Sequence, residues 1–385
     1  MAEKRWERWV WDCFLTLCVF VALFGCDRLR IVPGKIPPLS SEKFNKLWVV
    51  TSDYSTGVLV GIDLLDSSVQ ALRIGIHSDA IIRVPENNDY FYVVNRLGAD
   101  NIQVGDRTQK KVLGQFSVGR GTNPQDIAVV SSQVAYVSRL QSKTLLKVNP
   151  ITGAVIKEIN LFEHADIKTI SSSDPDGFPE MAWMRLLGNR LLIVMQRLNS
   201  EEGFIPSNKS QLAVLDLATD RVERIVDLRG TNPVTEIKLR DNELSIGEAG
   251  TLSVLDGGVE VFDLNMNTKG WVTTEQKLGG DIIDSALLTR ETGVAIIAKE
   301  IYGPNPITQL VVFRRSDGKM VSILKDLGIY SLHQIVVDEA RQIFYVADRN
   351  PKKPGVMVYD IKTLSPIFNG YYEVGLPPYH MVLAD

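Results

Sequence analysis

Seven titratable side chains recur along the chain at the same place in a repeating pattern. Each is a carboxylate or an imidazole just before a short apolar run, and successive members are 47 to 56 residues apart. The seven are Asp79, Asp126, Glu180, Glu236, Asp284, His333 and His380. Carboxylates held close together raise one another's pKa or bind a cation, and carboxylates mixed with imidazoles can bind a divalent metal ion. The spacing predicts a ring of these groups if the repeats surround an axis.

Three members of this set are the candidate metal ligands. Asp284, His333 and His380 combine one carboxylate with two imidazoles. These ligand types suit calcium, manganese or zinc. The sequence leaves three uses of the ring open: a ligand or metal site, a catalytic site, or polar residues that line a wet channel.

A second set of residues in the repeat is basic. Its members follow the next apolar strand of each unit, and they are Arg96, Arg139, Arg197, Lys299 and Arg349. If both sets reach the same rim, carboxylate–guanidinium pairs between them would be structural salt bridges. The basic set is otherwise a candidate anion site.

The elements that must position these residues are short β-strands. Apolar runs are separated by Gly, Pro, Asn and Asp, and there is no long helical period. One recurring strand ends in a turn acid, as in V-G-I-D at 60–63 and M-V-Y-D at 357–360. Such an acid caps a tight turn through its side-chain oxygen. A second recurring strand precedes it, as in Y-V-V-N at 92–95 and Y-V-A-D at 345–348.

The pattern predicts an all-β fold, a seven-bladed β-propeller of four-stranded antiparallel blades over residues 46–385. Seven units of about 50 residues, each with four strands, match the size of propeller blades. The innermost strands are expected at 79–84, 123–130, 180–186, 234–239, 282–288, 332–337 and 379–383. The strand at 379–383 should complete the first blade with strands near 47–51, 58–63 and 69–74, because this closure removes exposed edges. One propeller then replaces the two or three domains that length alone suggests.

The repeats resemble those of the YVTN/lactonase-like seven-bladed propeller family. The resemblance is carried by Y-V-V-N at 92–95, by P-x-x-I-A from Pro124 to Ala128, and by L-K-V-N-P-I-T-G at 146–153. It extends over nearly all of the chain that follows the N-terminal segment. It implies the fold and its repetition, and almost nothing about activity.

The longest loops are predicted on one face of the propeller. The segments 161–178 and 198–210 join strands on the face that carries the predicted ring. Each contains a phenylalanine that precedes or closely approaches a proline, Phe178 and Phe204. Long loops on a rigid scaffold are where binding usually occurs, although both could be plain insertions.

The N-terminal segment has the pattern of an export signal. Basic residues precede an apolar stretch at 13–25, which is too short to span a bilayer as a helix. The junction Leu23-Phe24-Gly25-Cys26 resembles the bacterial lipobox, which implies cleavage after residue 25 and lipidation of Cys26. Residues 26–45 would then form a tether, and the chain would be a membrane-anchored lipoprotein of the cell envelope, facing the periplasm or the exterior. An ordinary signal peptide and an uncleaved anchor are the alternatives.

Composition excludes several classes of function. The net charge is -4, and no Lys/Arg run longer than two occurs, so we expect no nucleic-acid binding. The nucleophile-elbow, P-loop and H-E-x-x-H motifs are absent from the sequence. The principal hypothesis is an envelope propeller that binds a small molecule or an envelope protein on its long-loop face. The alternatives are an enzyme, such as a hydrolase, lactonase or lyase, that uses the ring with or without a metal, and a scaffold in which the ring is structural.

Overall fold

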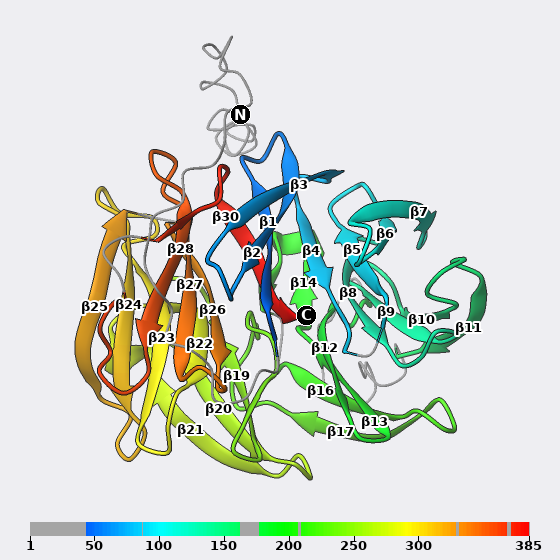
Figure 1. Ribbon diagram of the computed structural model, residues 1–385. Coiled ribbons are helices and arrows are strands. Elements are labelled where there is room, and N and C mark those ends of the chain that lie inside the picture. Colours follow the sequence, from blue (N-terminus) through cyan, green and yellow to red (C-terminus); the bar gives the residue numbers. More distant parts are fainter. Residues whose placement is uncertain are drawn as a thin grey trace, which may run out of the picture. The chain divides into compact units, whose positions relative to one another are not determined.

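The computed structural model describes residues 44–86, 88–161, 177–206, 209–328, 331–367 and 371–384. The predicted signal peptide, Cys26 and the tether up to residue 43 lie outside these residues, as does most of the predicted loop at 161–178. The described part contains seven four-stranded antiparallel sheets, which are the blades, and one two-stranded sheet. The all-β, seven-bladed propeller predicted from the sequence is therefore confirmed (Figure 1).

One strand of each blade lines the axis, and most of these strands contact the inner strand of the next blade. These innermost strands, from the first blade to the seventh, are β30 (Pro378–Ala384), β4 (Ala80–Arg83), β8 (Pro124–Val129), β12 (Met181–Leu187), β18 (Lys238–Arg240), β22 (Asp281–Leu287) and β26 (Leu332–Asp338). The second strands, in the same order, are β1 (Lys46–Ser52), β5 (Tyr90–Asn95), β9 (Ala135–Arg139), β13 (Arg190–Met195), β19 (Glu243–Glu248), β23 (Thr292–Lys299) and β27 (Ile343–Asp348).

The outer half of each blade completes the sheet. The third strands are β2 (Gly57–Asp63), β6 (Asn101–Asp106), β10 (Thr144–Val148), β16 (Gln211–Asp216), β20 (Gly258–Asp263), β24 (Ile307–Arg314) and β28 (Gly355–Asp360). The outermost strands are β3 (Val69–Ile76), β7 (Lys111–Ser117), β11 (Val155–Asn160), β17 (Arg221–Asp227), β21 (Thr268–Thr274), β25 (Met320–Gly328) and β29 (Tyr372–Glu373). The remaining elements of the described residues are the hairpin β14 (Leu198–Asn199) and β15 (Ile205–Pro206), the short helix η1 (Ser200–Glu202), and α2 (Glu275–Leu278).

The C-terminal strand closes the ring, as predicted. In Figure 1 the red β30 lies beside the blue β1, and the two strands pair antiparallel from Lys46 opposite Ala384 to Thr51 opposite Pro378. A segment from the end of the sequence therefore supplies the axial strand of the first blade. This pairing fastens the ring, because it satisfies the inner edge of β1 with a strand from the far end of the chain.

The hydrophobic core is divided into layers between neighbouring blades. Leu47 and Val49 of the first blade pack in one cluster with Tyr345 and Val358 of the seventh. Strands inside a blade are covered on both faces, so six consecutive residues of β23 are buried, whereas most residues of β7 on the rim are not. Blade interiors therefore appear in the sequence as continuous apolar runs.

The turn acids make the predicted hydrogen bonds. The side chain of Asp63 accepts from the backbone of Leu65, and that of Asp360 accepts from the backbone of Lys362 and Thr363. These bonds end the third strand of a blade and turn the chain toward the fourth.

No helix in the described ranges is long and apolar enough to cross a membrane.

The fifth blade departs from the predicted strand limits. We expect its innermost strand at 234–239, and β18 covers only Lys238–Arg240. The residues before it are held differently: Pro233 forms an isolated bridge to Glu248, and the Thr235 hydroxyl accepts from the backbone of Gly247. Two more residues lie on this strand than on β19 between the two pairings, so the regular ladder is interrupted there.

Candidate functional site

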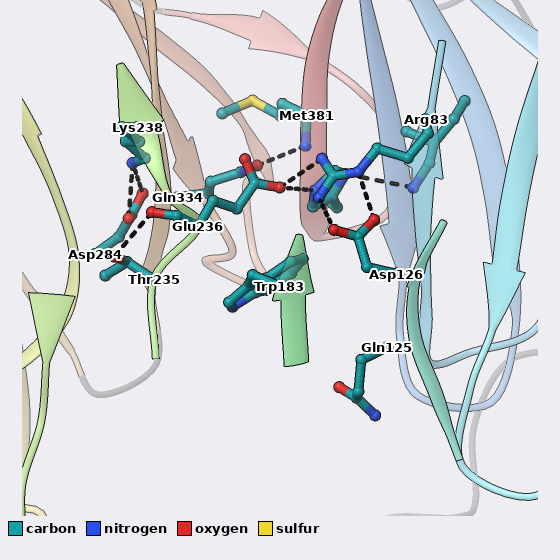
Figure 2. Close-up of polar contacts among 12 residues, drawn as sticks. Arg83, Gln125, Asp126, Trp183, Thr235, Glu236, Lys238, Asp284, Gln334 and Met381 are labelled. Carbon is teal, nitrogen blue, oxygen red and sulfur yellow. Dashed lines mark hydrogen bonds and ion pairs between the residues drawn. The ribbon is translucent and has the colours of Figure 1, made fainter. Parts of the chain in front are cut away.

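Charged side chains from separate blades meet at the axis. The Arg83 guanidinium holds both oxygens of Asp126, with distances of 2.7 Å from Nε to Oδ1 and 2.9 Å from Nη2 to Oδ2. Its Nη1 is 2.6 Å from Oε1 of Glu236, on the fifth blade (Figure 2). One arginine of the second blade therefore bridges carboxylates of the third and fifth blades.

His380 completes this contact from the first blade. Its Nε2 lies 2.9 Å from Oε1 of Glu236, and its Nδ1 accepts from the backbone N–H of Ile82 at 3.4 Å. Because Nδ1 is the acceptor, Nε2 carries the hydrogen and donates it to Glu236. Burial lowers the pKa of His380 in spite of the opposing effect of Glu236, so the imidazole is neutral.

A second ion pair lies beside the first. Nζ of Lys238 is 2.7 Å from each oxygen of Asp284 and donates to the backbone carbonyl of Ile335 at 3.0 Å. Burial raises the pKa of Asp284, and Lys238 opposes this shift. We call Arg83, Asp126, Glu236, His380, Lys238 and Asp284 the axial network (Figure 2).

The recurring polar side chain of the inner strands connects one blade to the next. Asp126 accepts from the backbone N–H of Met184 at 2.9 Å, and Asp284 accepts from that of Ile335 at 2.7 Å. Gln334 accepts from the backbone of Met381 at 2.6 Å, as His380 does from Ile82. The repeat that the sequence reveals therefore includes a blade-to-blade hydrogen bond at the axis.

The structure brings four of the seven predicted ring residues together. Asp126, Glu236, Asp284 and His380 belong to the axial network. The other three, Asp79, Glu180 and His333, lie outside this network, although His333 lines the same cavity as Glu236, Asp284 and His380.

Each of the remaining three lies near the start of an inner strand. Asp79 is 2.5 Å from Arg96, and Glu180 accepts from the backbone of Leu198 at 2.9 Å. His333 lies one residue before Gln334, with its ring centroid 4.7 Å from that of Tyr379. Register shifts interrupt most inner strands at this level, for example between Leu332 and Ile335, so the residue that faces the axis differs from blade to blade.

Two of the five basic residues lie near the axis. Arg96 donates to Asp79 and, at 2.8 Å, to the hydroxyl of Tyr379. Arg349 donates to the hydroxyl of Tyr54, and its guanidinium carbon lies 5.1 Å from the centre of the Tyr379 ring.

The other three basic residues are held within or beside their blades. Arg139 donates to the backbone carbonyls of Val118 and Thr144, and Arg197 donates to that of Lys209. Lys299 is half-buried at the end of β23.

A cavity of about 240 Å³, the mouth cavity, opens where the inner strands begin. Polar and aromatic side chains line it, among them Arg96, Gln125, Trp183, Gln196, Thr235, Glu236, Asp284, His333, Tyr379 and His380. In Figure 2, Trp183 and Gln125 lie on the same side of the axial network. The loops that leave the second strands lie on this face, because Arg96 and Gln196 follow β5 and β13.

A second cavity, of about 180 Å³, lies at the opposite ends of the inner strands. Its lining includes Arg185, Arg240 and apolar side chains such as Leu239 and Leu383. Glu236 lines both cavities, so the axial network lies between them.

The carboxylates of the axial network are balanced once the neighbouring Arg185 is counted, whereas a cation near the mouth has no counter-ion among the described residues. Arg83 and Lys238 pair with three carboxylates, and Arg185 adds a third cation that interacts with Glu236. At the mouth, burial together with Arg349 and Arg96 holds the pKa of His333 well below its usual value, so His333 is neutral.

Arg349 is the unbalanced charge. Arg96 has Asp79 as a counter-ion, whereas Arg349 forms no ion pair with a described carboxylate, and its Nε lacks a hydrogen-bond partner among the described residues. The mouth therefore carries one excess positive charge.

The candidate metal ligands are engaged in other contacts. Asp284 binds Lys238, and both nitrogens of His380 make hydrogen bonds within the protein. Over the residues that the structure describes, no three His, Cys, Asp or Glu side chains converge as metal ligands.

Four residues near the site were not predicted from the sequence: Arg83, Lys238, Tyr379 and Tyr54. The first two are the cations of the axial network, and the two tyrosines contact Arg349. A signal was present for the cations, because Arg83 and Lys238 follow apolar residues within inner strands, where a charge needs a partner.

Comparison with known proteins establishes the fold alone. No family model matches the chain, and no curated protein matches it in sequence. Among solved structures, the designed protein Ika8 has a TM-score of 0.53 at 12% identity, with 92% of this chain and 95% of that chain covered. The Dos1 propeller has a TM-score of 0.53 at 13% identity, covering 88% and 86%. Hydrazine synthase of Kuenenia stuttgartiensis has a TM-score of 0.52 at 15% identity, covering 73% and 76%.

Proposed function

We propose that the protein binds a small anionic group in the mouth cavity on its long-loop face. The observation that carries this proposal is Arg349, a nearly buried guanidinium with no described carboxylate partner, beside a cavity lined by aromatic and amide side chains. A buried cation without a counter-ion is unfavourable, and an anionic ligand would supply the missing charge.

The surrounding side chains suit such a ligand. Arg96 offers a second guanidinium, already oriented by Asp79 and the Tyr379 hydroxyl. Neutral His333 can accept or donate a hydrogen bond, and Thr235 and Gln196 add polar groups to the wall. The carboxylates of the axial network are neutralised by internal cations, which weakens their repulsion of an anion.

Titration calorimetry with citrate, glutarate and phosphate tests the proposal. We expect at least one of these anions to bind, and Arg349→Gln to reduce its affinity about tenfold or more. Affinity should rise as pH falls, because a bound anion favours protonation of His333. Arg315→Gln, an arginine on the outer part of the sixth blade, is the control and should have no effect. No binding of any of the three anions would reject the proposal.

The cellular setting forms a separate part of the proposal. The L-F-G-C junction supports a lipoprotein anchored through Cys26 to a membrane of the bacterial envelope, with a propeller resembling the YVTN/lactonase-like family. Cys26→Ala should abolish labelling by a radioactive fatty acid and leave an unprocessed precursor. Normal labelling and processing of this variant would disprove the anchor.

A further inference from the structure

Large apolar side chains are exposed around the mouth cavity. They lie on the loops that join the second and third strands of five blades, and their exposed fractions range from 40% for Phe204 to 78% for Tyr302. We call six of them the apolar crown: Tyr54, Leu97, Phe204, Leu252, Val254 and Tyr302. On the opposite face Leu65, Val130 and Leu186 are exposed, and further exposed apolar side chains, such as Val155 and Val321, lie on the outermost strands. Apolar groups gathered on one face mark an interaction surface.

Three crown residues adopt a backbone conformation that their side chains disfavour. Tyr54, Leu97 and Phe204 have φ values of 68°, 39° and 63°, in the left-handed region. This conformation costs a bulky residue about 1 kcal/mol or more, and Gly or Asn would form such turns more cheaply. At these positions the residue strains the backbone of the turn and also exposes an apolar side chain to water. Two such costs at one position point to a role for the side chain.

The crown loop of the fifth blade is held in place by hydrogen bonds. Asp281, which is almost fully buried, accepts from the backbone of Ser253 at 2.6 Å, and Asp256 accepts from Thr251 at 2.8 Å. These bonds fix the loop that carries Leu252 and Val254. A surface ordered in advance loses less conformational entropy when a partner binds.

Tyr54 joins the crown to the charge at the mouth. Its ring centre lies 5.0 Å from the guanidinium carbon of Arg349, and its hydroxyl accepts a hydrogen bond from that arginine. Arg349 therefore lies against Tyr379, which lines the mouth cavity, and the loops of the same face carry the apolar crown. The complementary shape is an acidic side chain flanked by apolar residues.

We propose that the partner of this face is a protein segment that places an Asp or Glu side chain in the mouth cavity and covers the apolar crown with flanking apolar residues. The inference rests on the proposed anion site and identifies the carrier of the anionic group. A protein is the expected partner, and not a lipid bilayer, because four carboxylates are exposed beside crown residues: Asp53, Glu201, Glu202 and Glu300. Carboxylates there would repel an anionic bilayer, whereas a protein can pair them with its own cations.

The test is selection of a displayed library of random 12-residue peptides on the purified full-length chain. We expect enrichment of peptides with Asp or Glu between Leu, Phe, Tyr or Trp. Their affinity should fall about tenfold or more in Arg349→Gln and in the double variant Leu97→Ser with Tyr302→Ser. Leu65→Ser is the matched control, since Leu65 is 59% exposed on the opposite face, and it should bind normally.

Several outcomes would overturn the inference. These are enrichment without an acidic residue, no enrichment, and binding that survives the crown variants. Crown-dependent binding to phosphatidylglycerol vesicles would assign the surface to a membrane, and crown-dependent self-association in sedimentation would assign it to a second copy. Glutarate or citrate binding to the same variants separates the two proposals. If the small anion binds through Arg349 while peptides ignore the crown, only the protein partner is rejected.

Discussion

The axial network and the mouth cavity above it are built from the same kinds of side chain but differ in how their charges are balanced. In the network, Arg83 and Lys238 each hold a carboxylate through two contacts. At the mouth, Arg349 contacts tyrosine rings and has no described counter-ion. The difference indicates that charges of the network stabilise the propeller, whereas the mouth retains a charge for a ligand.

Deleting residues 378–385 should have the largest effect, because it removes parts of both regions. The deletion takes away β30, and with it His380 of the network and Tyr379 of the mouth. The inner edge of β1 is then exposed, and the ring cannot close. We expect aggregation, or loss of the cooperative thermal transition followed by circular dichroism. A deletion variant with the wild-type Tm would show that ring closure contributes little.

Arg83→Gln and Arg349→Gln compare the two regions directly. Without Arg83, Asp126 and Glu236 lose their shared cation inside the channel, so the free energy of unfolding should fall by roughly 3 kcal/mol. Arg349→Gln should change it by less than about 1 kcal/mol, because that arginine has no ion pair to lose among the described residues and relief from an uncompensated charge offsets the lost hydrogen bond. Urea unfolding measures both. Equal losses would contradict the division between network and mouth.

The two regions should lose stability in different pH ranges, because His333 at the mouth and Glu236 in the network titrate at different pH values. The pKa of His333 is lowered by burial and by Arg349, Arg96 and His380, so below about pH 6.5 the unfolded chain binds protons that the folded chain does not. The contribution of each such histidine should therefore fall as pH decreases from 6.5, by up to about 1.4 kcal/mol per pH unit, and buried Glu275, whose pKa is raised to about 8, contributes with the opposite sign. His333→Gln should remove the His333 contribution and leave those of the other groups with shifted pKa, such as His380 and Glu275.

Glu236 should act at lower pH. Arg83 and His380 hold its pKa below the usual value despite burial, so its contribution is present above about pH 4.5 and is lost as pH falls further. Urea unfolding at a series of pH values from about 7.5 to about 2.5 resolves the two windows. An unchanged slope between pH 6.5 and 5 in His333→Gln would show that His333 titrates normally.

Tyr379→Phe should have the smallest effect. It removes the hydroxyl that accepts from Arg96 and keeps the ring beside His333 and Arg349. We expect a loss of about 0.5–1 kcal/mol in the free energy of unfolding and a few-fold weaker anion binding, since Arg96 loses one orienting contact. Tyr371→Phe is the control, because its hydroxyl bonds the Lys353 carbonyl on the outer part of the seventh blade. A tenfold loss of anion affinity would instead indicate that the Tyr379 hydroxyl contacts the ligand.

The sequence by itself determined the blades, their number and the closing strand. Three local patterns carried this information: continuous apolar runs, turn acids such as Asp63 and Asp360, and a final inner strand that no further strand of its blade follows in the sequence. Each reflects local hydrogen bonding or burial. The sequence also predicted Asp126, Glu236, Asp284 and His380 at equivalent places of the repeat. A polar side chain in an otherwise apolar strand must find a hydrogen-bond partner, and each of these four finds one near the axis.

Only the tertiary structure decided which of these charges find partners. Arg83 and Glu236 are 153 positions apart in the sequence, and no local pattern records their contact. Irregular pairing at the start of an inner strand changes which residue contacts the neighbouring blade. In the seventh blade, Gln334 makes that contact, and His333 lies at the mouth cavity. The excess charge of Arg349 is likewise a property of the assembled ring, because it depends on which carboxylates the other blades bring within reach.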